Sequence, residues 1–130
     1  YTLHTLFPYT TLFRSMNRRY GHIGRQVARL AKAFGARVIA CTREGAAKPI
    51  GGFILEGTGD EDGSLPEAYF KMGEKASLHA FLARCDVLVN ALPSSDATKQ
   101  FLGKEEFTAM KDTAIVVNVS ASLARGLKLF

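Results

Sequence analysis

Gly21 and Gly24 are residues whose type and spacing suit a definite chemistry, the binding of a diphosphate. In a dinucleotide-binding turn, one glycine lets the backbone approach the pyrophosphate, and another lets the following helix pack closely against its strand. That helix directs free N–H groups and the positive end of its dipole at the phosphates. Arg19 stands where an additional glycine would make the tight first turn. Since glycines also serve turns and caps, the pair has to be judged by the elements around it.

The residues after the pair predict a helix over 22–34 and then a buried strand. Apolar residues recur at helical spacing and form one stripe, which comprises Ile23, Val27, Leu30, Ala31 and Phe34. The glycine that follows the last of them supplies the stop. The segment "ARVIAC", residues 36–41, is apolar apart from Arg37, and it predicts a strand buried on both faces, as in parallel sheets.

Helices and strands continue to alternate along the rest of the chain. Residues 42–75 predict a long loop with one helical turn near Pro66. A helix over 75–85 directs Leu78, Phe81 and Leu82 to one side, and a buried strand over 86–91 follows. After a loop over 92–103, a helix over 104–111 leads to a third buried strand over 113–119. We therefore predict an α/β fold, a Rossmann-type doubly wound parallel sheet with right-handed crossovers.

The composition excludes several classes of protein. With 130 residues, 47% of them hydrophobic, and a mean hydropathy of +0.02, the chain suits one soluble globular domain. No apolar run reaches the ~20 residues that span a bilayer and no secretory signal is recognisable, so we expect a cytoplasmic protein without a membrane partner. Cys41 and Cys85 have no further cysteine or histidine at metal-ligand spacing, and the acidic "DEDG" lacks the later ligands of a calcium loop. No metal site or disulfide framework is expected.

The net charge of +5 favours an anionic partner. The arginines near the glycine pair crowd around one turn and form no stripe with interleaved aromatic residues; they are Arg14, Arg18, Arg19 and Arg25. We therefore expect no nucleic-acid partner.

Two segments, "YGHIGRQVARLAKAFGARVIA" and "CDVLVNALPSSDATKQFLGKEEFTAMKDTAIVVNVS", closely resemble the NAD(P)-binding domain of the D-isomer-specific 2-hydroxyacid dehydrogenases. The resemblance runs from about Tyr20 to Ser120, and the insert "GTGDEDGSLPEAYF" looks like that of fungal-type members. It implies a parent enzyme that moves hydride between NAD(P)H and a small 2-keto or 2-hydroxy acid and that forms a homodimer. In the family a strand and an additional glycine precede the turn, and Arg19 departs from that pattern.

The resemblance also implies where a nicotinamide dinucleotide would bind. Ile23 packs beside the cofactor, Leu92 and Pro93 cover its adenine side, Thr98 follows in the same loop, and Asn118 to Ser120 approach the nicotinamide end. Ligands of open α/β sheets bind outside the carboxyl ends of the strands, where "ALP" and "NVS" stand, although "ALP" also suits a plain loop. The predicted cofactor site comprises Tyr20, Gly21, His22, Ile23, Gly24, Thr42, Arg43, Leu92, Pro93, Thr98, Asn118, Val119 and Ser120.

Thr42 and Arg43 stand at the end of the second strand, the position that distinguishes the two nicotinamide cofactors. An acid there would accept the ribose hydroxyls of NAD and repel the extra phosphate of NADP. A hydroxyl and a guanidinium can instead bind that phosphate through charge-assisted hydrogen bonds, so we favour NADP over NAD. The alternative is that Arg43 points into solvent and Glu44 takes the ribose. At the start of the helix, the backbone N–H of His22 is expected to matter more than its ring.

No complete catalytic set is recognisable, and we assign no catalytic residue. Reduction of a 2-keto acid needs a cation that polarises the substrate and an acid that protonates the alkoxide. The resemblance implies an arginine after the strand 113–119 and then a glutamate and a histidine, but Ala121 stands in the arginine's place. Arg125 and Gly126 repeat the expected pair later, so residues 121–130 are expected to be out of frame or non-native, a real insertion being the alternative. His79 is expected at the surface or its boundary.

The residues before the glycine turn form a segment whose origin has two interpretations. Thr5 to Ser15, "TLFPYTTLFRS", matches the codon-by-codon translation of a string that resembles a widely used short-read sequencing adapter. We therefore expect residues 1–15 to be artefactual and the first strand of the sheet to be missing. The alternative is a genuine edge strand broken by Pro8. These boundaries leave a partial NAD(P)-binding domain over residues 16–120.

Two other hypotheses concern function. A nucleotide-sensing regulator can use the same fold without performing chemistry. The chain as given could also lack any function, because the loss of a central strand removes half the packing surface of the helix over 22–34, unless "TLFRSMN" fills the gap.

Overall fold

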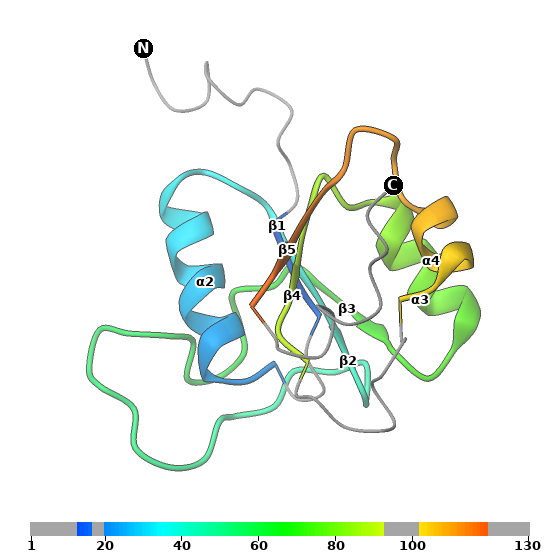
Figure 1. Cartoon of the computed structure of the whole chain (residues 1–130). Coiled ribbons are helices and arrows are strands. Elements are labelled where there is room, and N and C mark those ends of the chain that lie inside the picture. Colours follow the sequence, from blue (N-terminus) through cyan, green and yellow to red (C-terminus); the bar gives the residue numbers. More distant parts are fainter. Residues whose placement is uncertain (1–12, 17–19, 93–101, 120–130) are drawn as a thin grey trace.

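The computed structural model describes residues 13–16, by their backbone, together with residues 20–92 and 102–119. They form a five-stranded sheet in the order β3-β2-β1-β4-β5 (Figure 1). The strands are β1 (Phe13–Met16), β2 (Val38–Thr42), β3 (Ala68–Lys71), β4 (Val87–Asn90) and β5 (Ile115–Asn118). The helices are α2 (His22–Ala33), α3 (Lys75–Ala83) and α4 (Lys104–Ala109). All four strand pairs are parallel, which confirms the predicted fold class.

The expectation that the first strand is missing is wrong. β1 lies in the centre of the sheet, where Phe13 is in register with Val38 of β2 on one side and with Val87 of β4 on the other. A parallel strand is held by main-chain N–H and C=O groups, which every residue except proline supplies. The short extended segment "FRSM" directly precedes the glycine turn, so it takes the central position whatever the origin of its codons.

The loop predicted over 42–75 contains a strand that the sequence analysis missed. β3 is an edge strand in which Ala68 pairs with Ile39 and Lys71 with Thr42 of β2. The helical turn expected near Pro66 is not formed, because the chain is already extending there toward β3 and the amide of Glu67 donates to the carbonyl of Val38 at 2.9 Å. Only 'AYFK' marks this strand in the sequence, and four residues are too few to show a period.

Alternate residues of β2 enter two different cores, as the pleat of a strand requires. Ile39 and Cys41 pack against α3 and α4, in a core that includes the buried residues Leu78, Phe81, Leu82, Leu88 and Leu92. Val38 and Ala40 pack under α2, in a smaller core with Tyr20, Ala28 and Ala31. The prediction that Leu78, Phe81 and Leu82 share the inner side of one helix is confirmed. α2 therefore covers one face of the sheet, and α3 and α4 cover the other (Figure 1).

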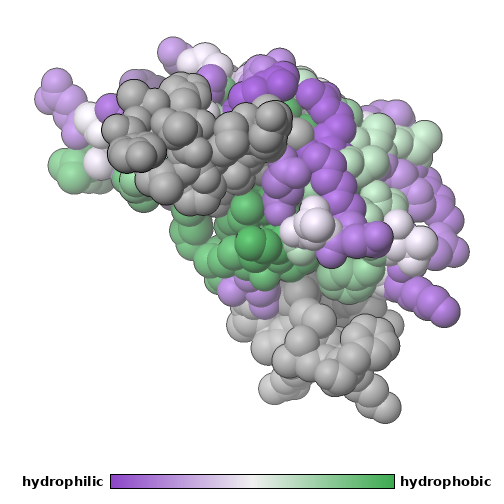
Figure 2. All heavy atoms as spheres, turned by 90° about the horizontal axis from the view of Figure 1, so that it is seen from above, coloured by the Kyte–Doolittle hydropathy of each residue, from purple (hydrophilic) through white to green (hydrophobic). Residues whose placement is uncertain are grey.

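The inner side of α2 agrees with the predicted apolar stripe at Ala31 and differs from it elsewhere. Its buried residues are Gly24, Arg25, Ala28 and Ala31, whereas Ile23, Leu30 and Phe34 are 58%, 51% and 60% exposed. Small side chains let the helix approach the sheet closely, so the larger apolar ones point outward. β5 was likewise expected to be buried, yet Ile115 and Val117 are exposed because no described helix covers that side of this edge strand. Figure 2 shows a hydrophobic area on the surface seen from above.

α2, with 12 residues, is the longest of the described helices. None of these helices is long and apolar enough to cross a membrane.

Candidate cofactor-binding site

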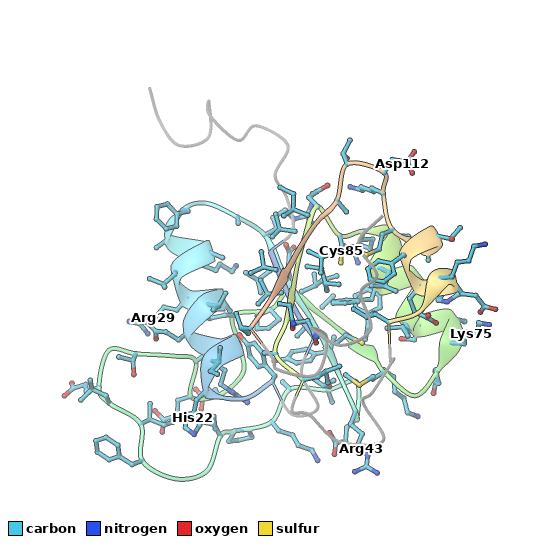
Figure 3. The ribbon with its side chains drawn as sticks, viewed as in Figure 1. His22, Arg29, Arg43, Lys75, Cys85 and Asp112 are labelled. Carbon is cyan, nitrogen blue, oxygen red and sulfur yellow. The ribbon has the colours of Figure 1, made fainter. Side chains whose placement is uncertain are left out.

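The glycine turn delivers the start of α2 to the carboxyl edge of the sheet. Gly21 is the N-cap residue, with extended backbone, and its carbonyl accepts the amide of Arg25 at 3.0 Å. A helix start leaves the N–H groups of its first turn without acceptors inside the helix, and the first turn of α2 carries no acidic side chain. Gly24 is buried, as close packing of helix and strand requires, and His22 is exposed (Figure 3). The turn can therefore present amide donors to an anion.

Tyr20 supports the turn from inside the protein. Its backbone is left-handed, with φ +48°, which is unusual for a bulky residue. Its side chain is 1% exposed, its hydroxyl donates to Asp60 at 3.1 Å, and its ring meets that of Tyr69 edge-on. Burial, with the nearby carboxylate of Asp60, raises the pKa of the Tyr20 hydroxyl far above its usual value. The side chain of Tyr20 is therefore not available for the predicted cofactor contact.

A cavity of about 530 Å³ joins the glycine turn to the end of β2. Its lining includes Gly21 and His22 from the turn, Thr42 from β2, and Glu44 and Lys48 from the segment beyond β2. A volume of this size lies within the usual range for small-molecule and cofactor sites. The structure thus brings three of the predicted site residues, Gly21, His22 and Thr42, to one cavity.

The end of β2 presents both polar and charged groups. Thr42 is buried, and its Oγ1 accepts the amide of Gly45 at 3.0 Å, which fixes the turn after the strand. Arg43 is exposed (Figure 3) and is absent from the cavity lining. Glu44 pairs with Lys48, with 3.3 Å between Oε1 and Nζ, and this hydrogen bond lowers the pKa of the Glu44 carboxyl. The cavity is therefore lined by one acid and one lysine from the same short segment.

Asn90 joins the carboxyl ends of β4 and β5 and was missed in the sequence. Its side-chain amide donates to Asn118 Oδ1 at 3.2 Å, and its own Oδ1 accepts the amide of Leu92 at the same distance. Its carbonyl accepts the amide of Val119. The two asparagines at corresponding ends of parallel strands, "VLVN" and "IVVN", are the signal that could have revealed this link.

The remaining predicted site residues lie in different surroundings. Ile23 is exposed on α2, Leu92 is buried in the core against α3 and α4, and Asn118 and Val119 are exposed at the end of β5. Their contacts with a cofactor stay predictions. Pro93, Thr98 and Ser120 lie outside the described residues.

His79 is half-buried on α3, as expected of a boundary residue. Its Nε2 lies 3.8 Å from Glu106 Oε1 of α4. Together with Glu105, these side chains form a group whose possible ligand atoms all lie within 4.8 Å of one another. The group belongs to the layer of α3 and α4, opposite α2, and takes no part in the cavity.

The chain matches the family model described as D-isomer specific 2-hydroxyacid dehydrogenase, NAD binding domain, over residues 19–126. It is 31% identical over 102 residues to a glyoxylate reductase of Thermococcus kodakarensis, a match that covers 78% of this chain and 25% of that protein. A glyoxylate reductase of Thermococcus gammatolerans is 34% identical, with the same coverage of both chains. The chain spans about a quarter of the length of these relatives.

Among solved structures, the chain is similar to a glycerate dehydrogenase related protein from Thermoplasma acidophilum. The TM-score is 0.61 at 26% identity, and the match covers 86% of this chain and 32% of that one.

Proposed function

Because the chain belongs to the D-isomer-specific 2-hydroxyacid dehydrogenase family and matches its NAD-binding domain, we propose that it is the cofactor-binding part of an oxidoreductase. The parent enzyme would transfer hydride between NAD(P)H and a small 2-keto or 2-hydroxy acid. The observation that carries this proposal is the cavity between the glycine turn and the end of β2. Its position outside the carboxyl ends of parallel strands is where open α/β sheets bind nucleotides.

The residues of the cavity fit a dinucleotide. Gly21 lets the backbone come close to a pyrophosphate, and the first amides of α2 would hold its oxygens. Thr42 stands where the adenosine ribose would lie. When bound, the cofactor supplies the hydride, and this chain orients it.

The groups that act on the substrate are proposed to lie in the portion of the relatives that this chain does not match. They would be a cation that binds and polarises the keto acid and an acid that protonates the alkoxide. The 130-residue chain is then expected to bind cofactor without catalysing turnover.

NADP is proposed as the preferred cofactor. No acid stands at the end of β2, where Thr42 and Arg43 are found, and Arg43 is exposed and free to turn toward a phosphate. The alternative, with Glu44 bound to the ribose hydroxyls of NAD, is supported by the place of Glu44 in the cavity lining.

A titration of the 130-residue chain with NADPH and with NADH, followed by cofactor fluorescence, tests the proposal. Saturable binding of at least one cofactor, with tighter binding of NADPH, is the expected result. Absence of binding to either cofactor would refute the assignment as a cofactor-binding domain.

The parent is further proposed to be a cytoplasmic homodimer. Support for the dimer comes from the exposed apolar side chains of α2, which are Ile23, Leu30 and Phe34. A subunit interface over them would remove apolar surface from water. Cys41 and Cys85 are both buried thiols, as is usual in a reducing compartment. Sedimentation of the chain at several concentrations tests the association.

A further inference from the structure

The segment between β2 and β3, residues 43–67, is tied to α2 by a buried arginine. Arg25 is 2% exposed, and its guanidinium donates to four backbone carbonyls. One of these belongs to Tyr20 in the turn, and three belong to Lys48, Asp60 and Glu61 in the segment. The guanidinium also lies over the ring of Tyr20, 4.7 Å from its centroid. The five donors of a planar guanidinium suit this arrangement, because they can serve acceptors from several directions at once.

Asp60 completes the attachment. Its carboxylate accepts the hydroxyl of Tyr20 at 3.1 Å and the amides of Ser64 and Leu65 at 2.9 and 3.0 Å. Gly63 packs directly against the arginine: a side chain there would lie 3.3 Å from Arg25 Nη1, and its φ is +71°. Hydrogen bonds therefore hold the segment, part of which lines the cavity, against α2, the helix that follows the glycine turn.

This attachment places Lys48 at the cavity. The carbonyl of Lys48 accepts from Arg25 Nη2 at 2.5 Å, which fixes its backbone beside α2. Its side chain is 61% exposed and pairs with Glu44, and both residues line the cavity together with His22 and Thr42. An exposed pair of this kind is weak, so the ammonium group can exchange its partner at little cost.

The cavity lining carries two cationic side chains, Arg25 and Lys48, against one acid, Glu44, so its charges sum in favour of an anion. The guanidinium of Arg25 is held by backbone carbonyls, which leaves Lys48 as the cation that can move toward that anion. The ribose 2′ position of a bound dinucleotide lies at the end of the second strand, where Thr42 stands. A phosphate at that position would be within the same cavity as Lys48.

We propose that Lys48 is a specificity-determining residue, whose ammonium group leaves Glu44 and binds the phosphate on the adenosine ribose of NADP, and that Arg25 is the positioning residue that holds it there. The proposal rests on the proposed function. No bond is made or broken in this exchange. The proposal assigns the phosphate to Lys48, which lines the cavity, whereas the sequence alone pointed to Arg43, which does not.

The test compares NADPH and NADH, which differ only in that phosphate, as ligands of the 130-residue chain and its variants. Lys48→Gln is expected to weaken NADPH binding by about tenfold relative to NADH binding, the value of one charge-assisted hydrogen bond. Lys32→Gln is the matched control, since it removes the same charge from an exposed position in the last turn of α2. It should change neither affinity by more than about twofold.

Arg25→Lys tests the positioning role with a readout of its own. It keeps the charge but cannot donate to all four carbonyls, so NADPH binding should weaken and residues 43–67 should lose protection from hydrogen exchange. Lys48→Gln should leave that protection unchanged.

The outcomes separate the two proposals. If the unaltered chain binds NADH but not NADPH, or if Lys48→Gln changes both affinities alike or neither, the role of Lys48 is refuted and the cofactor site stands. If the unaltered chain binds neither cofactor, the proposed function itself is refuted.

Discussion

The two faces of the sheet are held by different means. On the side of α3 and α4, large apolar side chains such as Phe81, Leu82 and Leu88 are buried together. On the side of α2, the buried helix residues are small, and a polar cluster of Tyr20, Arg25 and Asp60 joins helix, turn and loop. The first side gains its stability from apolar burial, which is not directional. The second depends on hydrogen bonds whose loss leaves buried groups unpaired, and the cavity beside the glycine turn lies on this side.

The largest effect is expected in the apolar face. Phe81→Ala removes a fully buried ring and should lower the free energy of unfolding by about 3–5 kcal/mol, measured by urea denaturation. Phe53→Ala is the control, because the ring of Phe53 is 85% exposed, and it should change stability by less than about 0.5 kcal/mol. Equal effects of the two substitutions would show that the core of α3 and α4 is not formed.

Arg25→Met should have the next largest effect on the free energy of unfolding. It tests whether a charged residue stabilises the packing of α2 on the other face of the sheet. It leaves buried carbonyls without a donor, so a loss of about 2–4 kcal/mol is expected in the same urea experiment. Arg29→Met is the matched control on the same helix, since Arg29 makes one exposed hydrogen bond, to Gly59. A stable Arg25→Met protein would contradict the account of the polar cluster.

The free energy of unfolding at high pH should distinguish the two faces, because it begins to fall at a different pH for the buried thiol of one face and the buried tyrosine of the other. Burial raises the pKa of the Cys41 thiol from 9.0 to about 12, so above pH 9 the unfolded chain loses this proton while the folded chain keeps it. Stability should therefore fall by about 1 kcal/mol between pH 9 and pH 10 from this group, and Cys41→Ala should remove that part of the slope.

The raised pKa of Tyr20 gives a second fall of stability with rising pH, of the same sign as that from Cys41. The contribution of Tyr20 to the free energy of unfolding is complete below pH 10, the usual pKa of tyrosine, and declines above it. Tyr20→Phe should abolish this decline. The measurement is the free energy of unfolding against pH for each variant and the parent chain. A parent curve that is flat from pH 9 to pH 11 would contradict both assignments.

The smallest effect on the stability of the monomer is expected at Phe34. Although the sequence places it in the apolar stripe of α2, it is 60% exposed, so Phe34→Ser should change unfolding by less than about 0.5 kcal/mol. It should weaken self-association if the dimer covers this stripe, as measured by sedimentation. A destabilisation as large as that of Phe81→Ala would mean that the stripe faces the sheet.

The apolar face was the part that the sequence predicted well. Leu78, Phe81 and Leu82 have helical spacing, and β2 and β4 contain the short apolar runs "VIAC" and "VLV", so local pattern and burial agree there. The inner side of α2 was predicted wrongly, because periodicity identifies an apolar stripe but does not tell whether a neighbouring sheet needs small side chains. Gly24, Ala28 and Ala31, at helical spacing, carried that information.

Three residues of the predicted cofactor site lie together in the structure for a related reason. Gly21, His22 and Thr42 follow local motifs at the turn and the strand end, and the structure brings them to one cavity. The contact between Arg25 and Lys48, on which the proposed role of Lys48 rests, could not be predicted, because it spans 23 positions in the sequence and depends on the path of an irregular segment. No local pattern specifies such a path.

The central claim is that the glycine turn and the end of β2 receive a dinucleotide. The most direct test is the change in backbone amide chemical shifts of the 130-residue chain when NADPH is added. The account predicts saturable shifts at residues 21–24, Thr42 and Lys48, and unchanged shifts in α3 and α4. Shifts confined to α3 and α4, or no saturable shift at the turn, would contradict it.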